Sequence, residues 1–441
     1  MSYPQAPERE RRSLRWLWWL IVLLLILPPV VALLAFRSWR AGVREELRSE
    51  IERIKAAGEP TTIEEIIPLI PIAGNNAADV YHQAFPLLQV TQEEETNVVL
   101  PLPEGMDDEW LAAARDVVAG HEPYFGLLDR ASSMPECAFP LNWYDLGNAD
   151  FAQYTQMRQA ARMLGLRSLV LAQDGEADEA LASLRAELRV SEHTQSNGML
   201  IGALAGWAIQ GITAARAQDV LSAATPSAAA CRETFEELDS LDPQAALERA
   251  LQVERVVCGL DEASMFRGGG LPDEMRKGAA LFALSRDYDQ LAYLRLMQRQ
   301  IDAVSLPWPR SKEESAEAYR EVEEDNVLLT ALSRTVIPVF SRALESEEKV
   351  NARIRAWQIA LALTAYLAEN GRYPDDLEAL RATGWDLPLD PFTQQDFRYR
   401  REGEGFVVWS LGPNMADEGG EYRSPRNDAA APDDVSFRCS R

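Results

Sequence analysis

The stretch that decides the fold is residues 151–188, FAQYTQMRQAARMLGLRSLVLAQDGEADEALASLRAEL. Leucine, methionine and alanine recur in it at spacings of three and four, which is typical of helices that bury one stripe of side chains. The polar run Gln173-Asp174-Gly175 interrupts this pattern and indicates a turn. We therefore expect two amphipathic helices that pack against each other.

Further helices of ordinary length are expected on both sides of this pair. They are predicted at residues 107–131, 199–221, 231–241, 243–260 and 286–306. The central pair is similar to one tetratricopeptide unit, whereas a solenoid of such units needs about three stacked copies at a constant period. The sequence thus predicts a helical, weakly tetratricopeptide-like domain over residues 73–344 in a protein of the mainly α class.

An uninterrupted apolar run, WLWWLIVLLLILPPVVALLAF, occupies residues 16–36. A helix of about 20 residues matches the hydrocarbon core of a bilayer, about 30 Å thick. A cleaved signal peptide has a shorter apolar region, about 7–15 residues, and a small residue where Leu33 stands here. We expect a retained transmembrane signal anchor, preceded by a cytoplasmic arm (1–15) and followed by a stalk helix and linker (37–72).

Basic residues do not decide the orientation of this helix. Four arginines precede it and four follow it closely: Arg9, Arg11, Arg12, Arg15, Arg37, Arg40, Arg44 and Arg48. The upstream arm is short and the acidic mass lies downstream, which favours an N-in helix with the rest exported. Arginine also far outnumbers lysine, as in GC-rich bacterial genomes. We expect a single-pass protein of the bacterial cytoplasmic membrane with most of the chain extracytoplasmic.

The net charge restricts the partners of the chain. Asp and Glu total 69 against 44 Lys and Arg, which gives a formal charge of −25. Nucleic-acid affinity comes mainly from basic side chains that displace counterions from phosphates, and basic patches also bind anionic lipid. A nucleic-acid partner is therefore not expected. The membrane contact is expected through the N-terminal helix alone, and the protein partners are expected to be other envelope proteins.

The sequence offers little for catalysis. It has three histidines, and His121-Glu122 lacks the second histidine of a zinc protease helix. Glu192-His193 lies near a predicted helix end, where we expect a surface or capping residue. Gly268-Gly269-Gly270 lacks the Gly-Lys-Ser/Thr of a phosphate loop. No catalytic or cofactor-binding residue is predicted, and we expect the protein not to be an enzyme.

The four cysteines, Cys137, Cys231, Cys258 and Cys439, include no C-x-x-C pair. Zinc ribbons and thioredoxin-type sites are thereby excluded. Two readings remain open, namely disulfides, with Cys231 and Cys258 as the better pair, and free buried thiols.

The last hundred residues have a different pattern. An amphipathic helix ends at Asn370-Gly371, where glycine supplies a left-handed stop. Two aromatic and β-branched runs, 397–400 and 406–410, are joined by a glycine-containing turn and predict an antiparallel hairpin. The remaining residues up to Phe437, rich in Gly, Asp and Asn, are expected to form a loop.

Residues 348–437 resemble the C-terminal domain of the type II secretion major pseudopilin. The shared pattern is a long helix ending in Y-x-x-x-x-G-x-Y-P, then D-P-F, a hairpin, S-L-G-P-N, a Gly-Gly pair and a final Asp-Asp. It is carried by Tyr366, Gly371, Tyr373, Pro374, Asp390, Pro391, Phe392, Ser410, Leu411, Gly412, Pro413, Asn414, Gly419, Gly420, Asp433 and Asp434. The resemblance implies a small α+β domain over residues 345–441.

The same resemblance implies a calcium site in the final loop. The family's carbonyl ligand falls on Leu411 and its acidic ligands on Asp433 and Asp434, while its first Asp falls on Asn414, which carries no charge. Asp417, together with the neighbouring Glu418, is expected to compensate. Ca²⁺ is bound by six to eight hard oxygens from flexible loops, which these residue types supply.

Two departures limit the resemblance. The chain lacks the short basic leader, the processing glycine and the glutamate of the mature pseudopilin helix, and about 300 residues separate its anchor from the C-terminal domain. We therefore expect no processing or polymerisation as a pilus subunit. The sequence favours a membrane-anchored extracytoplasmic scaffold or interaction protein without catalysis. The alternatives are a ligand- or peptide-binding helical sensor and, third, an exported hydrolase that uses paired carboxylates.

Overall fold

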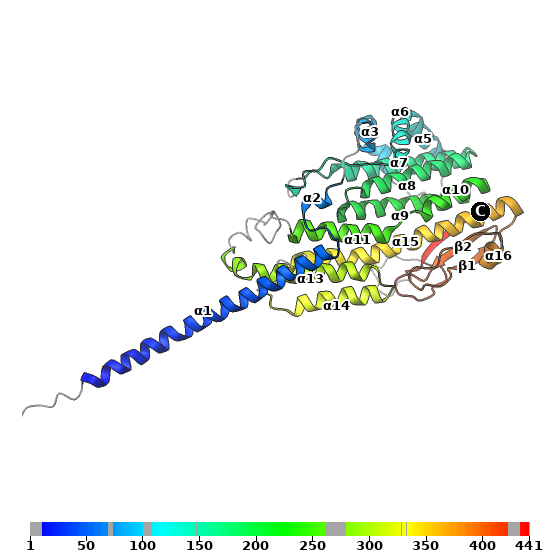
Figure 1. Cartoon of the computed structure of the whole chain (residues 1–441). Helices are drawn as coiled ribbons and strands as arrows, with labels where there is room; N and C mark the ends of the chain where they lie inside the picture. The colour runs from blue at the N-terminus through cyan, green and yellow to red at the C-terminus, as the bar shows by residue number, and fades with distance from the viewer. Residues whose placement is uncertain are drawn as a thin grey trace, which may run out of the picture.

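The structure is a computed structural model (Figure 1) that describes residues 11–68, 74–99, 107–146, 149–260, 279–327, 329–331, 333–421 and 433–440. The protein is mainly helical and has a small antiparallel sheet near its C-terminus, as the sequence predicts. Long helices lie side by side in layers, and one N-terminal helix projects from them (Figure 1). The glycine run 268–270 lies outside the described residues.

The bounds of the elements are as follows. The longer helices are α1 (Arg11–Ala56), α5 (Asp108–Gly120), α6 (Glu122–Ser132), α7 (Ala152–Gln173), α8 (Ala177–Gln195), α9 (Leu200–Ala223), α10 (Ala228–Asp239), α11 (Pro243–Glu254), α13 (Ala279–Val304), α14 (Arg310–Glu324) and α15 (Ser333–Asn370). The short ones are α2 (Ile63–Ile66), α3 (Ala77–Ala84), η1 (Phe85–Leu87), α4 (Gln92–Glu94), the π-helical turns η2 (Glu95–Val99) and η4 (Arg255–Leu260), and α16 (Leu377–Arg381). The strands are β1 (Arg398–Glu402), β2 (Gly405–Ser410) and β3 (Val435–Cys439).

Helix α1 runs without a break from the apolar stretch into the charged segment that follows. By length and composition its part from Trp18 to Ala56 is long and apolar enough to cross a membrane. The large apolar side chains between Trp18 and Leu34 are exposed, and this half of the helix lies away from the other elements (Figure 1). Such exposure suits a lipid environment better than water.

The second half of α1 docks on α13 instead of standing free. Arg40 and Arg44 both place Nε near Asp287 Oδ2, at 3.3 and 2.8 Å. Further along the two helices, Arg295 of α13 pairs with Glu46 of α1 at 2.8 Å. Asp287 is only 8% exposed, so the contact is partly shielded from solvent. The predicted stalk is therefore a helix fixed to the body of the protein.

The helix pair predicted over residues 151–188 is present. Helices α7 and α8 are joined at Asp174-Gly175, where Gly175 has φ +85°, and α9 packs against both. The periodic leucines Leu169, Leu181 and Leu184 are fully buried. These helices form the centre of the helical body because each turns one apolar stripe toward the others.

Helix α15 connects the helical body to the C-terminal sheet. It packs against α9 and α10, and it also packs against β2 and β3. A single buried cluster contains Leu221 from α9, Trp357 from α15, and Phe406 and Phe437 from the sheet. Residue 345 lies inside this helix, so the two regions share one core.

The sheet has the strand order β1-β2-β3, with both pairs antiparallel. The predicted hairpin is confirmed, with Val408 opposite Tyr399. The expectation of a loop up to Phe437 was wrong at its end, because β3 pairs with β2 and places Phe437 opposite Val408. In β3 the alternate residues Val435, Phe437 and Cys439 are buried. This period of two buries one face on α9 and α15 and covers the open edge of β2.

His193 also differs from expectation, because it is a core residue and not a surface or capping residue. It is 4% exposed; its Nδ1 lies 2.9 Å from the Tyr81 hydroxyl and its Nε2 lies 3.1 Å from the Met134 carbonyl oxygen. Burial, assisted by Arg189, lowers the pKa of His193 to about 4. The four cysteines are free thiols, so the pairing of Cys231 with Cys258 is not formed.

Candidate cation site at the end of the sheet

Two segments meet beyond the end of β2, namely the loop after Ser410 and the Asp433-Asp434 pair that precedes β3. Gly412 has φ +64°, and a Cβ placed on it would lie 2.4 Å from the Asp433 carbonyl oxygen. Both the backbone conformation and this close approach require glycine. The S-L-G-P segment and the final Asp-Asp of the sequence are therefore in direct contact.

Three acidic residues lie around this contact, Glu418, Asp433 and Asp434, although their described side chains are not gathered closely enough to form a group that could hold a metal ion. Asp434 is fully buried, and its Oδ2 accepts hydrogen bonds from the backbone N–H groups of Glu418 (3.1 Å) and Gly420 (2.8 Å). Its Oδ1 is buried without a hydrogen-bond partner among the described residues, and the same is true of Asp433 Oδ1 and Glu418 Oε2. A buried carboxylate oxygen that has lost water and gained no partner is costly.

The electrostatics reflect this crowding of negative charge. Burial, followed by the negative charge of Glu418 nearby, raises the pKa of Asp434 to about 7, although the hydrogen bond from the Gly420 N–H favours the ionised form. Burial and the charge of Glu418 also raise the pKa of Asp433. Both shifts mean that the folded loop disfavours the ionised carboxylates, and a bound cation would reverse that preference.

The other predicted ligands are placed differently. Asn414 Oδ1 accepts from the Ala416 N–H at 2.6 Å, and Asn414 Nδ2 donates to Glu418 Oε1 at 2.8 Å. Asp417 turns toward the sheet, where its Oδ1 accepts from Trp409 Nε1 at 3.0 Å. Glu418, expected only as a supplement to Asp417, is the acidic side chain that joins Asp433 and Asp434. Leu411 begins the loop.

The sequence feature that could have identified Glu418 as a residue of this site is the pair of glycines that follows it. Gly419 and Gly420 have φ values of +75° and +82°. These conformations turn the backbone so that the N–H groups of Glu418 and Gly420 both reach Asp434 Oδ2. The Gly-Gly pair in the sequence thus marks which acid faces the site.

Another acidic residue, Asp390 of the D-P-F motif, holds the start of the same loop. Its Oδ1 accepts from Ser410 Oγ (2.8 Å) and the Phe392 N–H (3.0 Å). Its Oδ2 accepts from Thr393 Oγ1 (3.1 Å) and the Leu411 N–H (3.2 Å). With four donors for two oxygens, Asp390 is fully satisfied and serves as a structural clamp.

The loop is also attached to the helical body. Trp308, just before α14, donates from Nε1 to the Pro413 carbonyl oxygen at 3.2 Å. Its ring packs edge-on against Phe392, with ring centroids 5.2 Å apart. The residues around the carboxylates are thus held from the sheet, the D-P-F turn and α14.

The oxygen atoms of this loop are of the type that hard cations bind, but in this structure they are not assembled into a metal site. Across the described part of the chain no three His, Cys, Asp or Glu side chains are gathered into a group that could hold a metal ion. Ca²⁺ takes six to eight oxygens, from carbonyls as well as carboxylates. The three unpartnered carboxylate oxygens would supply the anionic part of such a set, with Leu411 and Asn414 as neutral oxygen donors nearby in the chain.

Comparisons with known proteins found no match for this chain among family models, curated proteins or solved structures.

Proposed function

We propose that the chain is a membrane-anchored extracytoplasmic scaffold or interaction protein of the bacterial cytoplasmic membrane, without catalytic activity. The observation that carries the proposal is the docking of α1 on α13 through Asp287 directly beyond the apolar run. A single helix thereby connects the membrane rigidly to a large helical body. This arrangement suits a protein that presents a surface to other envelope proteins at a fixed place.

The C-terminal domain is proposed to be pseudopilin-like and to bind Ca²⁺. Asp433, Asp434 and Glu418 would hold the ion, with Leu411 and Asn414 as further oxygen donors, whereas Asp417 is engaged by Trp409. Bound Ca²⁺ would neutralise the carboxylates and fix the loop to the sheet. Its role in this proposal is structural, and the link to a secretion assembly rests on the sequence resemblance alone.

Thermal unfolding of the full-length protein in detergent tests the calcium proposal. A ligand that binds only the folded state at 100 times its Kd stabilises that state by about 2.7 kcal/mol. We expect a clear rise of Tm with Ca²⁺ over chelator, and little rise when Asp433→Asn and Asp434→Asn are combined. Glu404→Gln, in the exposed β1–β2 turn, is the matched control and should respond as the natural chain does. An unchanged Tm with Ca²⁺ would refute the site.

Membrane topology is tested separately. A cysteine introduced at Glu404 should react with a membrane-impermeant maleimide in intact spheroplasts. The natural chain is the control, because three of its four cysteines are buried and the fourth is half-buried. Labelling that requires permeabilised membranes would contradict an exported body.

The interaction role has its own test. A photo-crosslinking residue placed at the exposed Tyr144 should yield discrete higher-mass protein adducts in cells. The same residue at Leu24 in the apolar run serves as the control for contacts made within the membrane. If the exposed position gives no adduct, the interaction role loses its support.

A second function, recognition of a small ligand by the helical body, is favoured by one specific observation, a cavity that contains a buried hydroxyl without a hydrogen-bond partner among the described residues. The hydrolase alternative is less favoured. Glu347 and Glu348 form a pair of acids with raised pKa values, mainly through burial, but Glu347 is only 3% exposed and is not among the residues that line the described cavities.

A further inference from the structure

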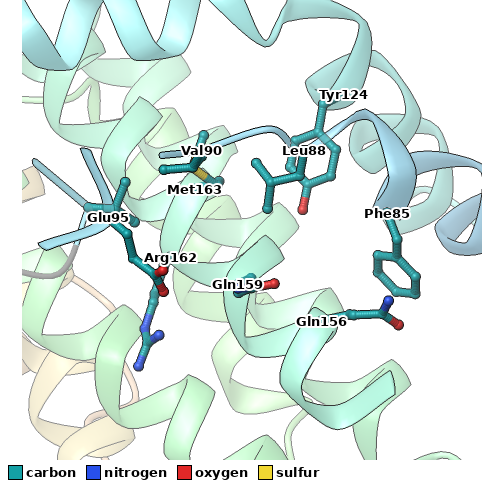
Figure 2. A pocket seen from close by; sticks show the side chains of 10 residues that line it. Phe85, Leu88, Val90, Glu95, Tyr124, Gln156, Gln159, Arg162 and Met163 are labelled. Atoms are coloured by element: carbon teal, nitrogen blue, oxygen red, sulfur yellow. The ribbon is translucent and has the colours of Figure 1, made fainter. Parts of the chain in front are cut away.

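A cavity of about 110 Å³ lies in the helical body, far along the chain from the carboxylate loop. One wall is α7, a second is Tyr124 of α6, and the third is the segment from η1 to η2 (Figure 2). Leu88 and Met163 are among its apolar side chains, while Glu95, Gln159 and Arg162 are polar. The cavity therefore combines an apolar interior with a small number of polar groups, as ligand sites do.

The buried polar group in this cavity is the Tyr124 hydroxyl. Tyr124 is 1% exposed, and its hydroxyl has no hydrogen-bond partner among the described residues. Figure 2 shows this hydroxyl directed toward the α7 side of the cavity, where Gln159 lies. Burial raises the pKa of Tyr124, so the group stays a neutral donor and acceptor. A ligand with a hydroxyl or carbonyl group would provide the missing partner.

One end of the cavity carries a positive and a negative side chain. Glu95 and Arg162 lie together at that end of the view, with Phe85 and Gln156 at the other (Figure 2). Within the described part of the chain neither side chain has an ion pair or a hydrogen bond. A ligand with a single charge would be attracted by one of these two side chains and repelled by the other. A zwitterion satisfies both.

We propose that this cavity binds a free α-amino acid with a short side chain. Arg162 would receive the carboxylate and Glu95 the ammonium group, while the side chain enters between Leu88 and Met163 below Tyr124. A closed apolar cavity of about 150 Å³ holds benzene, so about 110 Å³ with an open end accommodates a side chain of a few atoms and a charged head group at the mouth. The proposal is independent of calcium binding.

Isothermal titration of the full-length protein in detergent, with four probes, tests the zwitterion requirement. L-Valine and L-threonine are isosteric; 3-methylbutanoate lacks the ammonium group of valine, and isobutylamine lacks its carboxylate. We expect both amino acids to bind at least tenfold more tightly than either singly charged analogue. If neither amino acid binds, or if an analogue binds as tightly as valine, the proposal is wrong.

Substitutions test the location. Arg162→Gln and Glu95→Gln should each weaken valine binding at least tenfold. Arg158→Gln and Glu93→Gln, both exposed and close in sequence, are matched controls and should leave it unchanged. If Arg162→Gln and Glu95→Gln leave the affinity for valine unaltered, valine binds elsewhere and the proposal is wrong.

Tyr124→Phe keeps the ring and removes the hydroxyl, so folding should be retained. Threonine should bind severalfold more tightly than valine to the natural chain, and this preference should disappear in the variant. An equal preference in both proteins would exclude Tyr124 as the partner of the ligand.

Discussion

Asp390 and Asp434 are buried carboxylates at the same end of the sheet, on either side of Ser410. Asp390 accepts four hydrogen bonds, two on each oxygen. Asp434 accepts two on Oδ2 and has none on Oδ1 among the described residues. The first arrangement is complete without any ligand. Among the described residues the second leaves one oxygen available for a proton or a cation, so burial alone does not distinguish a carboxylate with a structural role from a candidate ligand.

The largest effect is expected for Asp390→Ala. The substitution leaves the N–H groups of Phe392 and Leu411 and the Ser410 hydroxyl without their acceptor, and hydrogen bonds to a charged group contribute about 1.5–3 kcal/mol each. Chemical denaturation should show a loss of at least about 3 kcal/mol, equal with Ca²⁺ and with chelator. Asp386→Ala, on the exposed part of the same loop, is the control. If the loss of stability depends on calcium, Asp390 would not differ from Asp434 in the way that we infer.

Gly412→Ala should have the next largest effect. The new Cβ meets the Asp433 carbonyl oxygen at 2.4 Å and the residue must keep φ +64°, so we expect a loss of about 2–3 kcal/mol and of the calcium response. Gly419→Ala is the matched control, because its Cβ has a nearest neighbour only at 4.0 Å. It should show the cost of the backbone conformation alone, about 1 kcal/mol. Equal losses would mean that the contact with Asp433 is unimportant.

Glu187 is a buried carboxylate in the helical body. It is fully buried on α8 beside Arg216, and burial raises its pKa to about 8. The folded state therefore holds a proton that the unfolded state releases above about pH 4.5. Its contribution to stability is present below that pH and declines as the pH rises toward 8, by about 1.4 kcal/mol per pH unit.

Glu187→Gln should remove this decline between pH 5.5 and 7.5, which denaturation at several pH values would reveal. Glu179→Gln, at an exposed position of the same helix, should retain it. If the free energy of unfolding of the Glu187 variant still declines with pH, a different group is responsible for the pH dependence.

The smallest effect is expected for Asp287→Asn. This acid is satisfied by the two arginines of α1, and partly exposed ion pairs contribute about 1 kcal/mol or less. Global stability should hardly change. Limited proteolysis near residues 37–56 should become faster, whereas Glu52→Gln, whose partner Lys55 lies on the same helix, should leave it unaltered. An unchanged cleavage rate would show that the remaining contacts hold α1.

The helical part of the fold was predictable because its leucine and alanine spacings are local. The α7–α8 pair and the β1–β2 hairpin are each formed by one continuous segment, residues 152–195 and 398–410. Strand β3 was not predictable in the same way, because it begins 25 residues after β2 ends (435 − 410) and its alternation covers only Val435, Phe437 and Cys439. Its assignment depends on partners distant in the chain.

The candidate cation site was predictable in residue type but not in geometry. Asp433 and Asp434 followed from the family pattern, while Asp417 and Glu418 are neighbours with the same charge. They are distinguished by contacts that the sequence does not show, since Asp417 accepts a hydrogen bond from Trp409 and the Glu418 side chain accepts one from Asn414. The burial of His193 was not predictable from its neighbours in the sequence, because its partners, the Tyr81 hydroxyl and the Met134 carbonyl oxygen, are distant in the chain.

The continuity of α1 has a mechanical consequence. Trp39, whose ring centroid lies 5.8 Å from that of Tyr288 on α13, is three residues beyond Phe36, so this attachment to the body occurs about 4.5 Å along the helix axis from the end of the apolar run. A bilayer that becomes thinner or thicker changes the tilt of a helix of fixed apolar length. For the proposed membrane-spanning α1, its contacts with α13 would transmit that tilt to the helical body, whose inclination would then follow membrane thickness.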